Sequence, residues 1–173
     1  MLVSRSGSLF AVILMLVAAL ALLSGCGGDS GPQTKEGFIL EADGVCESFV
    51  GEFSEAGSQN PATAKGVADA NKVLADLYER FGERIGELRL PAGGAARTQA
   101  QAYVNSVRGS KPQLDQLRLA SDDFLEAAEV GEARALQTAG ADLRSALDAF
   151  RATRSSSDRL AVAYGLNLCG NLD

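Results

Sequence analysis

The chain has 173 residues, with 16 Lys and Arg against 22 Asp and Glu and a formal net charge of −6. It contains no His, which excludes Ser-His-Asp and Cys-His catalytic relays, His-ligated zinc and Glu-x-x-His di-iron sites. The negative charge argues against nucleic-acid partners and against electrostatic docking on anionic lipid headgroups.

The N-terminal residues have the features of an export signal. Arg5 supplies positive charge, and residues 10–23 form an unbroken apolar run that is short for a transmembrane helix. The run leads into Leu23-Ser24-Gly25-Cys26, which resembles the lipobox of bacterial lipoproteins. This resemblance implies a diacylglyceryl group on the Cys26 thiol and cleavage before this residue.

A lipobox at this position divides the chain into three parts. Residues 1–25 would be a removed signal peptide, 26–35 the lipidated Cys26 and a flexible tether, and 36–173 the folded domain. The domain would lie outside the cytoplasm, anchored to the cell membrane by lipid. Two acyl chains give stable anchoring, whereas a single chain binds a membrane only marginally. An ordinary secretory signal, with Cys26 present by chance, is the alternative.

The remaining cysteines favour a disulfide. If Cys26 carries lipid, Cys46 and Cys169 are left, and an even number in an exported protein favours a bridge between them. Free thiols with a redox role are less favoured, because the spacing is not Cys-x-x-Cys and no His can activate them. Unpaired or intermolecular thiols are a third possibility.

Helical periodicity runs through the chain after the tether, without long alternating stretches. An apolar stripe predicts a first helix over 36–55. A break follows at 57–61, where Asn60 should cap the second helix and Pro61 should occupy its first position. The second helix is expected over 61–89 and ends before Pro91-Ala92-Gly93-Gly94. The residues of the first stripe are Phe38, Ala42, Val45, Phe49 and Phe53.

A third helix is expected over 95–129. Gly109-Ser110-Lys111-Pro112 lies in its middle, but the apolar phase continues on both sides, so we favour one kinked helix over two separate ones. The fourth helix is expected over 132–164, where Ser155-Ser156-Ser157-Asp158 is a candidate break. Gly165 should end it as a left-handed C′ residue.

Four amphipathic helices joined by short turns predict an all-α, up-down-up-down four-helix bundle. In that topology the end of the fourth helix lies near the start of the first. A C-terminal tail folded back along the first helix can therefore bring Cys169 to Cys46. The helices are unequal in length, so the longer ones should project beyond the first.

A Cys in an early helix (Cys46) is combined here with Tyr164-Gly165-Leu166 and Cys169-Gly170 near the chain end. With these features the mature domain resembles small all-helical lipoproteins of GC-rich Gram-positive bacteria. Because such proteins are largely without assigned activity, the resemblance implies location and fold and no chemistry.

Four groups of side chains are candidates for ligand sites, and each has a structural interpretation that we favour. The acids of the second helix can pair with Arg80 and Arg84. The acids near the third turn lack the spacing and glycine of a calcium loop. The arginines of the fourth helix can pair with acids, and the tyrosines suit the core. The groups are Glu79, Glu83 and Glu87; Asp122, Asp123, Glu126, Glu129 and Glu132; Arg144, Arg151, Arg154 and Arg159; Tyr78, Tyr103 and Tyr164.

With no catalytic set in the sequence, we expect no enzyme activity, cofactor or metal. The first hypothesis is a lipid-anchored accessory or interaction module for another cell-envelope protein, which an exposed apolar patch would favour. The alternative is a binding module for a small apolar or amphipathic ligand between the helices, against which a filled core would argue. An enzyme would require a buried carboxylate pair in a cleft.

Overall fold

The computed structural model describes residues 31–57 and 62–172. Residues 33–173 form one unit, separate from residues 1–32. The signal peptide, Cys26, Asn60 and Pro61 lie outside the described residues. Within the described ranges every regular element is a helix. The helices are α2 (Lys35–Gly57), α3 (Ala64–Glu87), α4 (Gly94–Arg108), α5 (Lys111–Val130) and α6 (Ala133–Tyr164).

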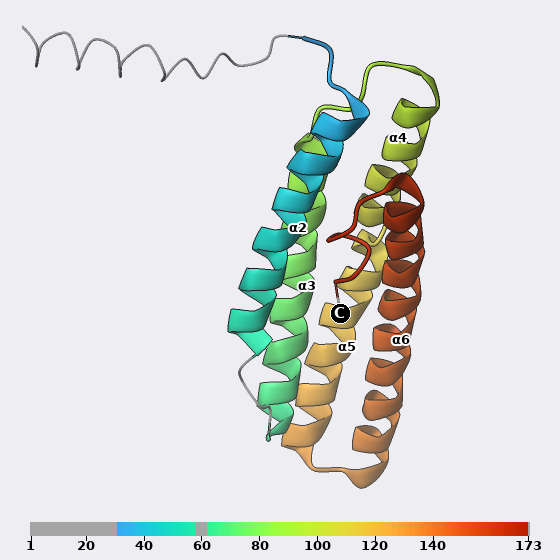
Figure 1. Ribbon diagram of the computed structural model, residues 1–173. Helices are drawn as coiled ribbons and strands as arrows, with labels where there is room; N and C mark the ends of the chain where they lie inside the picture. Colours follow the sequence, from blue (N-terminus) through green and yellow to red (C-terminus); the bar gives the residue numbers. More distant parts are fainter. Residues whose placement is uncertain (1–30, 58–61, 173) are drawn as a thin grey trace, which may run out of the picture. The chain divides into compact units, whose positions relative to one another are not determined.

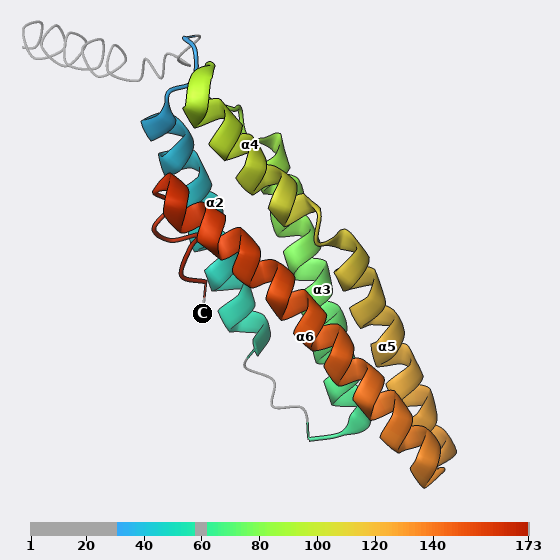
Figure 2. The ribbon, with the colours of Figure 1, turned by 90° about the vertical axis from the view of Figure 1, so that its right-hand side faces the viewer.

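The helices form four antiparallel arms of a bundle. Helices α2, α3 and α6 are one arm each, and α4 followed end to end by α5 makes the third arm in chain order (Figures 1 and 2). Helix α3 contacts α2, α4 and α5, and α6 contacts α4 and α5. The predicted all-α, up-down-up-down bundle is therefore confirmed. The α5–α6 end extends beyond the end of α2, as the unequal lengths predicted (Figure 1).

The third arm consists of two helices, so the prediction of one kinked helix over 95–129 is wrong. Helix α4 ends at Arg108, α5 begins at Lys111, and Gly109 and Ser110 form the turn. Pro112 has no amide hydrogen, so the ladder of backbone hydrogen bonds is interrupted there. Both turn residues nevertheless keep right-handed backbone angles (φ −69° and −77°), so the arm keeps its direction.

Two helix boundaries also bear on the predictions. Helix α3 starts at Ala64 instead of residue 61, because Thr63 caps it and its hydroxyl accepts a hydrogen bond from the Gly66 amide at 3.0 Å. Helix α6 is unbroken through Ser155–Asp158 and ends at Tyr164. Gly165, with φ 103°, is the predicted left-handed C′ residue, and the Leu166 amide donates to the Ala161 carbonyl at 2.9 Å.

Aromatic side chains connect three of the arms at the centre of the core. The ring of Phe49 on α2 meets Tyr78 on α3 edge to face, with 5.9 Å between centroids. Tyr78 meets Phe150 on α6 in the same way at 4.9 Å. Edge-to-face pairs contribute about 0.5–1.5 kcal/mol each beyond the burial of their surface.

The C-terminal tail lies between α2 and α6 (Figure 1) and is covalently held there. Cys46 and Cys169 form the predicted disulfide, with their Cα atoms 5.2 Å apart. Leu166, Cys169 and Leu172 are buried. The Leu168 amide donates to Asp43 Oδ1 at 3.2 Å, and the Arg154 guanidinium donates to the Leu172 carbonyl. The tail thus contributes a wall of the core.

Replacement of both bridging cysteines, Cys46→Ala with Cys169→Ala, should lower the free energy of unfolding by about 2–5 kcal/mol. The bridge constrains the unfolded chain, and its loss also frees the tail. Urea unfolding at neutral pH measures the effect, with the reduced wild-type domain as a control expected to resemble the double variant. Equal stability of variant and oxidised wild type would contradict the role given to the bridge.

Stability should also fall at high pH because of the core tyrosines. Burial raises the pKa of Tyr78 to about 12, and burial raises the pKa of Tyr103 further. The unfolded chain ionises near pH 10, so the folded state holds these protons more tightly. Stability is then complete below about pH 10 and declines as the pH rises toward 12.

The absorbance of ionised tyrosine measures the raised tyrosine pKa values directly, because the chain has 3 Tyr and no Trp. In a pH titration the folded domain should ionise its tyrosines later than the same chain in denaturant. Coincident titration curves for the folded and denatured chain would show that the tyrosines are accessible to solvent.

Candidate functional site

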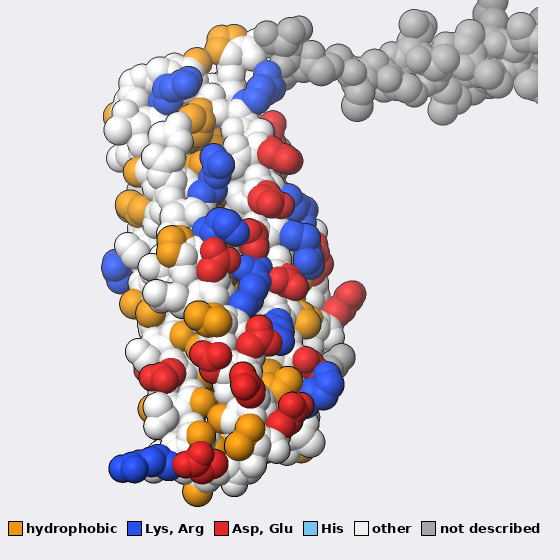
Figure 3. All heavy atoms as spheres, turned by 180° about the vertical axis from the view of Figure 1, so that it is seen from behind, with side chains coloured by type: hydrophobic (Ala, Val, Ile, Leu, Met, Phe, Trp, Pro, Cys, Tyr) orange, Lys and Arg blue, Asp and Glu red, His pale blue; other side chains and the backbone are white. Residues whose placement is uncertain are grey.

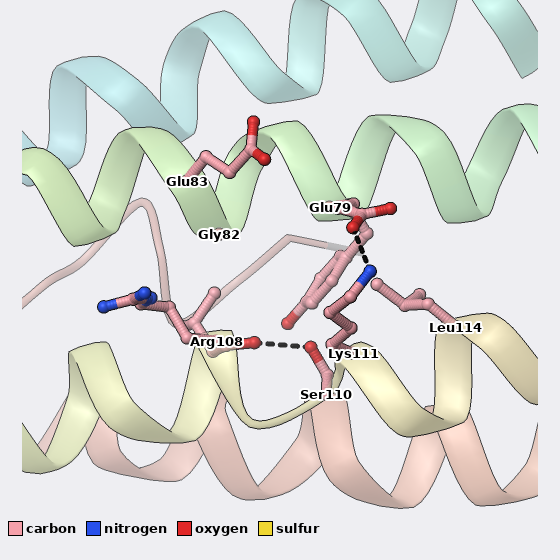
Figure 4. A pocket seen from close by; sticks show the side chains of 9 residues that line it. Glu79, Gly82, Glu83, Arg108, Ser110, Lys111 and Leu114 are labelled. Atoms are coloured by element: carbon pink, nitrogen blue, oxygen red, sulfur yellow. Dashed lines mark hydrogen bonds and ion pairs between the residues drawn. The ribbon is translucent and has the colours of Figure 1, made fainter.

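A pocket of about 220 Å³ lies where α3 passes the turn between α4 and α5 (Figure 4). Gly82 lines it, and the lack of a side chain there lets α3 pass close to Val107 and Arg108. Its charged residues come from three helices, with two acids on α3, one cation at the end of α4 and one at the start of α5. The lining residues are Tyr78, Glu79, Gly82, Glu83, Val107, Arg108, Ser110, Lys111 and Leu114.

Ion pairs occupy one side of this pocket. Glu79 accepts hydrogen bonds from Lys111 and, at 2.5 Å, from Arg118. Arg118 also binds Asp76 at 2.8 Å. The hydrogen bonds from Lys111 and then Arg118 lower the pKa of Glu79, and the hydrogen bond to Glu79 raises the pKa of Lys111. Both groups therefore stay charged near neutral pH, which does not suit either for acid–base catalysis.

The other polar groups of the pocket do not converge on a common point. Glu83 and Arg108 extend in different directions (Figure 4), and the Ser110 hydroxyl donates to the Val107 carbonyl of its own turn. The volume of about 220 Å³ is below the roughly 300–1,000 Å³ of typical small-molecule sites. The pocket can accept water or a small ion more readily than a drug-sized ligand.

The candidate acids of α3 lie on the surface, but their pairing differs from the expectation. Arg80 and Arg84 were expected to pair with acids three residues further along α3. Instead both reach Glu52 on α2, at 3.7 Å and 3.0 Å. The expected pairs are wrong because α2 packs alongside α3 and brings a carboxylate within reach of both long side chains.

The arginines of α6 stabilise their own helix and the tail. Arg151 pairs with Asp148 at 3.1 Å, and Arg144 donates to the Gly140 carbonyl at 3.0 Å. Arg159 donates to the Ser155 hydroxyl at 3.1 Å. Arg154 holds the Leu172 carbonyl of the tail. The candidate tyrosines, Tyr78, Tyr103 and Tyr164, are buried in the core as expected.

The candidate acids near the third turn lie along and after the end of α5. Asp122 pairs with Lys72 of α3. In the described part of the chain no group of three or more His, Cys, Asp and Glu is arranged to hold a metal ion. Asp123, Glu126 and Glu132 instead line a groove on the outer side of α5 and α6.

Sequence reasoning missed this groove, which we name the α5–α6 groove. It consists of two adjoining hollows that share Asp123 and Asp142. Alanines spaced seven apart on both helices (Ala120 and Ala127, Ala139 and Ala146) were the available signal, because small residues at such spacing leave a shallow seam. The other lining residues are Gln116, Leu119, Glu126, Val130, Glu132, Arg134, Ala135, Thr138, Ser145 and Ala149.

No helix within the described residues is long and apolar enough to span a membrane. The Cys46–Cys169 disulfide points to an extracytoplasmic location, because such bridges persist in oxidising compartments. Comparisons with protein-family models, with curated proteins and with solved structures found no match to this chain.

Proposed function

We propose that this protein is a lipid-anchored, extracytoplasmic helical domain that acts without catalysis, as an accessory or interaction module of the cell envelope. The observation that carries the proposal is the buried Cys46–Cys169 bridge between α2 and the tail. A bridge of this kind suits an exported protein. Together with the lipobox at Leu23-Ser24-Gly25-Cys26 it supports a domain held outside the membrane by lipid on Cys26.

Exposed apolar side chains support action by contact. Leu119 and Val130 on α5 are 63% and 67% exposed, and both line the α5–α6 groove. Leu40 on α2 and Val162 on α6 are also exposed. Single exposed apolar residues are ordinary, but two of them beside a groove support the hypothesis of an interaction module.

The interior offers little support for an enzyme. The buried polar residues in the described part of the chain are Ser110, Ser121 and Ser157, and no carboxylate is among them. Ser110 and Ser121 donate their hydroxyl hydrogens to carbonyls of their own segments. For the alternative of a small ligand between the helices, the pocket of about 220 Å³ is small, and the hollow of about 520 Å³ between α5 and α6 is shallow and open to solvent.

The lipid anchor is tested by Cys26→Ala in the full chain, expressed in a bacterium that processes lipoproteins. Metabolic labelling with a fatty-acid analogue should label the wild type and leave C26A unlabelled, because the thiol is the attachment atom. The pair Cys46→Ala and Cys169→Ala is the matched control and should keep the label. Labelling of C26A equal to wild type would overturn the anchor.

Action by contact is tested separately by photo-crosslinking in the intact envelope. A photoreactive residue is placed in turn at exposed positions on different helices, namely Leu40, Val73, Leu119 and Val162. A discrete crosslink to an envelope protein from any of them supports an interaction module. No crosslink at any position, together with a small molecule retained by the purified native domain, would favour the ligand-binding alternative.

A further inference from the structure

We propose that the α5–α6 groove is the docking site for a basic amphipathic helix of a partner protein. This inference rests on the proposed function and specifies its contact surface and the chemistry of the partner. It is carried by three features of the groove, namely its dimensions, its apolar floor and its unpaired carboxylates.

The dimensions of the groove suit a helix. Along α6 and its N-cap the groove runs from Glu132 to Ala149, and on α5 from Gln116 to Val130. At 1.5 Å rise per residue these stretches are roughly 20–25 Å long, which matches a helix of about four turns. Helix-in-groove recognition buries apolar side chains spaced three, four and seven residues apart, over a length of this order.

The floor of the groove is apolar and low. Ala120 and Ala127 on α5 face Ala139 and Ala146 on α6, and all four are buried or nearly so. Because alanine projects little, a third helix can approach the pair closely enough to place its own large side chains between them. Leu119 and Val130 provide larger apolar contacts, and the bundle itself leaves both exposed.

The charge of the groove selects the partner. The residues that line the groove include four acids, Asp123, Glu126, Glu132 and Asp142, against one cation, Arg134. None of these four acids forms an ion pair with another described residue. Figure 3 shows acidic and hydrophobic side chains intermixed at this end of the bundle. A helix with Lys or Arg beside its apolar face complements such a surface.

The groove also lies where a partner can reach it. The α5–α6 turn is at the end of the bundle opposite the start of α2 (Figure 1). The tether that precedes α2 joins the domain at that other end. An anchored domain would therefore be attached through the end away from the groove.

The test uses the secreted, disulfide-bonded domain and a synthetic helical peptide of about sixteen residues, with Leu on one face and Lys on the other. A peptide of the same composition with scrambled order, and one with Lys replaced by Glu, are the peptide controls. Fluorescence anisotropy should show binding of the first peptide only. The charge-reversed peptide should be repelled, and the scrambled peptide cannot present an apolar face.

Paired variants of the protein locate the site. Glu126→Lys with Asp142→Lys should weaken binding by roughly tenfold or more, since two attractive contacts become repulsive. Glu41→Lys with Glu47→Lys makes the same charge change at exposed positions of α2 and should leave the Kd unchanged. Leu119→Ser should weaken binding and Leu40→Ser should not, although both leucines are exposed.

Several outcomes would overturn the inference. Equal loss in the groove and α2 charge variants would show attraction to net charge alone, and equal binding of the scrambled peptide would remove the helix from the proposal. A wild-type domain that sediments as a dimer and becomes a monomer with Leu119→Ser would make the groove an interface between copies. If envelope crosslinks form from Leu40 or Val73 but the groove binds no peptide, the proposed function stands and this inference fails.

Discussion

The attachment of the C-terminal tail to α2 is the contact that holds together the part of the bundle where α2 starts and α6 ends. Helix α6 packs on α4 and α5, and the tail after Gly165 lies between α6 and α2. Its side chains Leu166, Cys169 and Leu172 complete the core there, and the Cys46–Cys169 bridge holds them in place. Lys35 lies 4.9 Å above the Tyr164 ring, and Phe38 meets the same ring edge on. The start of α2 and the end of α6 are therefore joined by covalent, cation–π and aromatic contacts around one short segment.

The turn between α4 and α5 is the second constraint, and it explains the pocket. Pro112 has no amide hydrogen, so a single helix over 94–130 would lack a backbone hydrogen bond at this position. The pocket lies beside this break, and the first turn of α5 places Lys111 next to Glu79. The ion pair between Lys111 and Glu79 joins the start of α5 to α3 and accounts for the charge on one side of the pocket. This is why we place the functional surface elsewhere.

The sequence predicted most of the fold because its signals were local. Apolar periodicity located the four arms, Gly165 marked the end of α6, and cysteine parity with helix order paired Cys46 with Cys169. The α4–α5 break was missed because the apolar phase continues through a turn with helical backbone angles. The Arg80 and Arg84 partner on α2 and the α5–α6 groove were missed for a different reason. Both depend on which helix faces which, and periodicity in one helix does not contain that information.

Asp123 and Glu126 of the groove, with Glu129 near them on α5, are placed where they do not stabilise their own helix. Glu126 and Glu129 stand in the last turns of α5, which contain no basic residue, and carboxylates at a helix C-terminus face the negative end of the helix dipole. Asp123, Glu126 and Glu129 are also three residues apart in sequence, so they repel one another along the helix. Glu79 on α3 and Glu52 on α2, by contrast, have cations in reach. Local choices that oppose the stability of a helix tend to mark functional positions. A basic helix in the groove would relieve both kinds of repulsion at once, so its binding would stabilise the very end of the bundle that the tail and its disulfide do not reach.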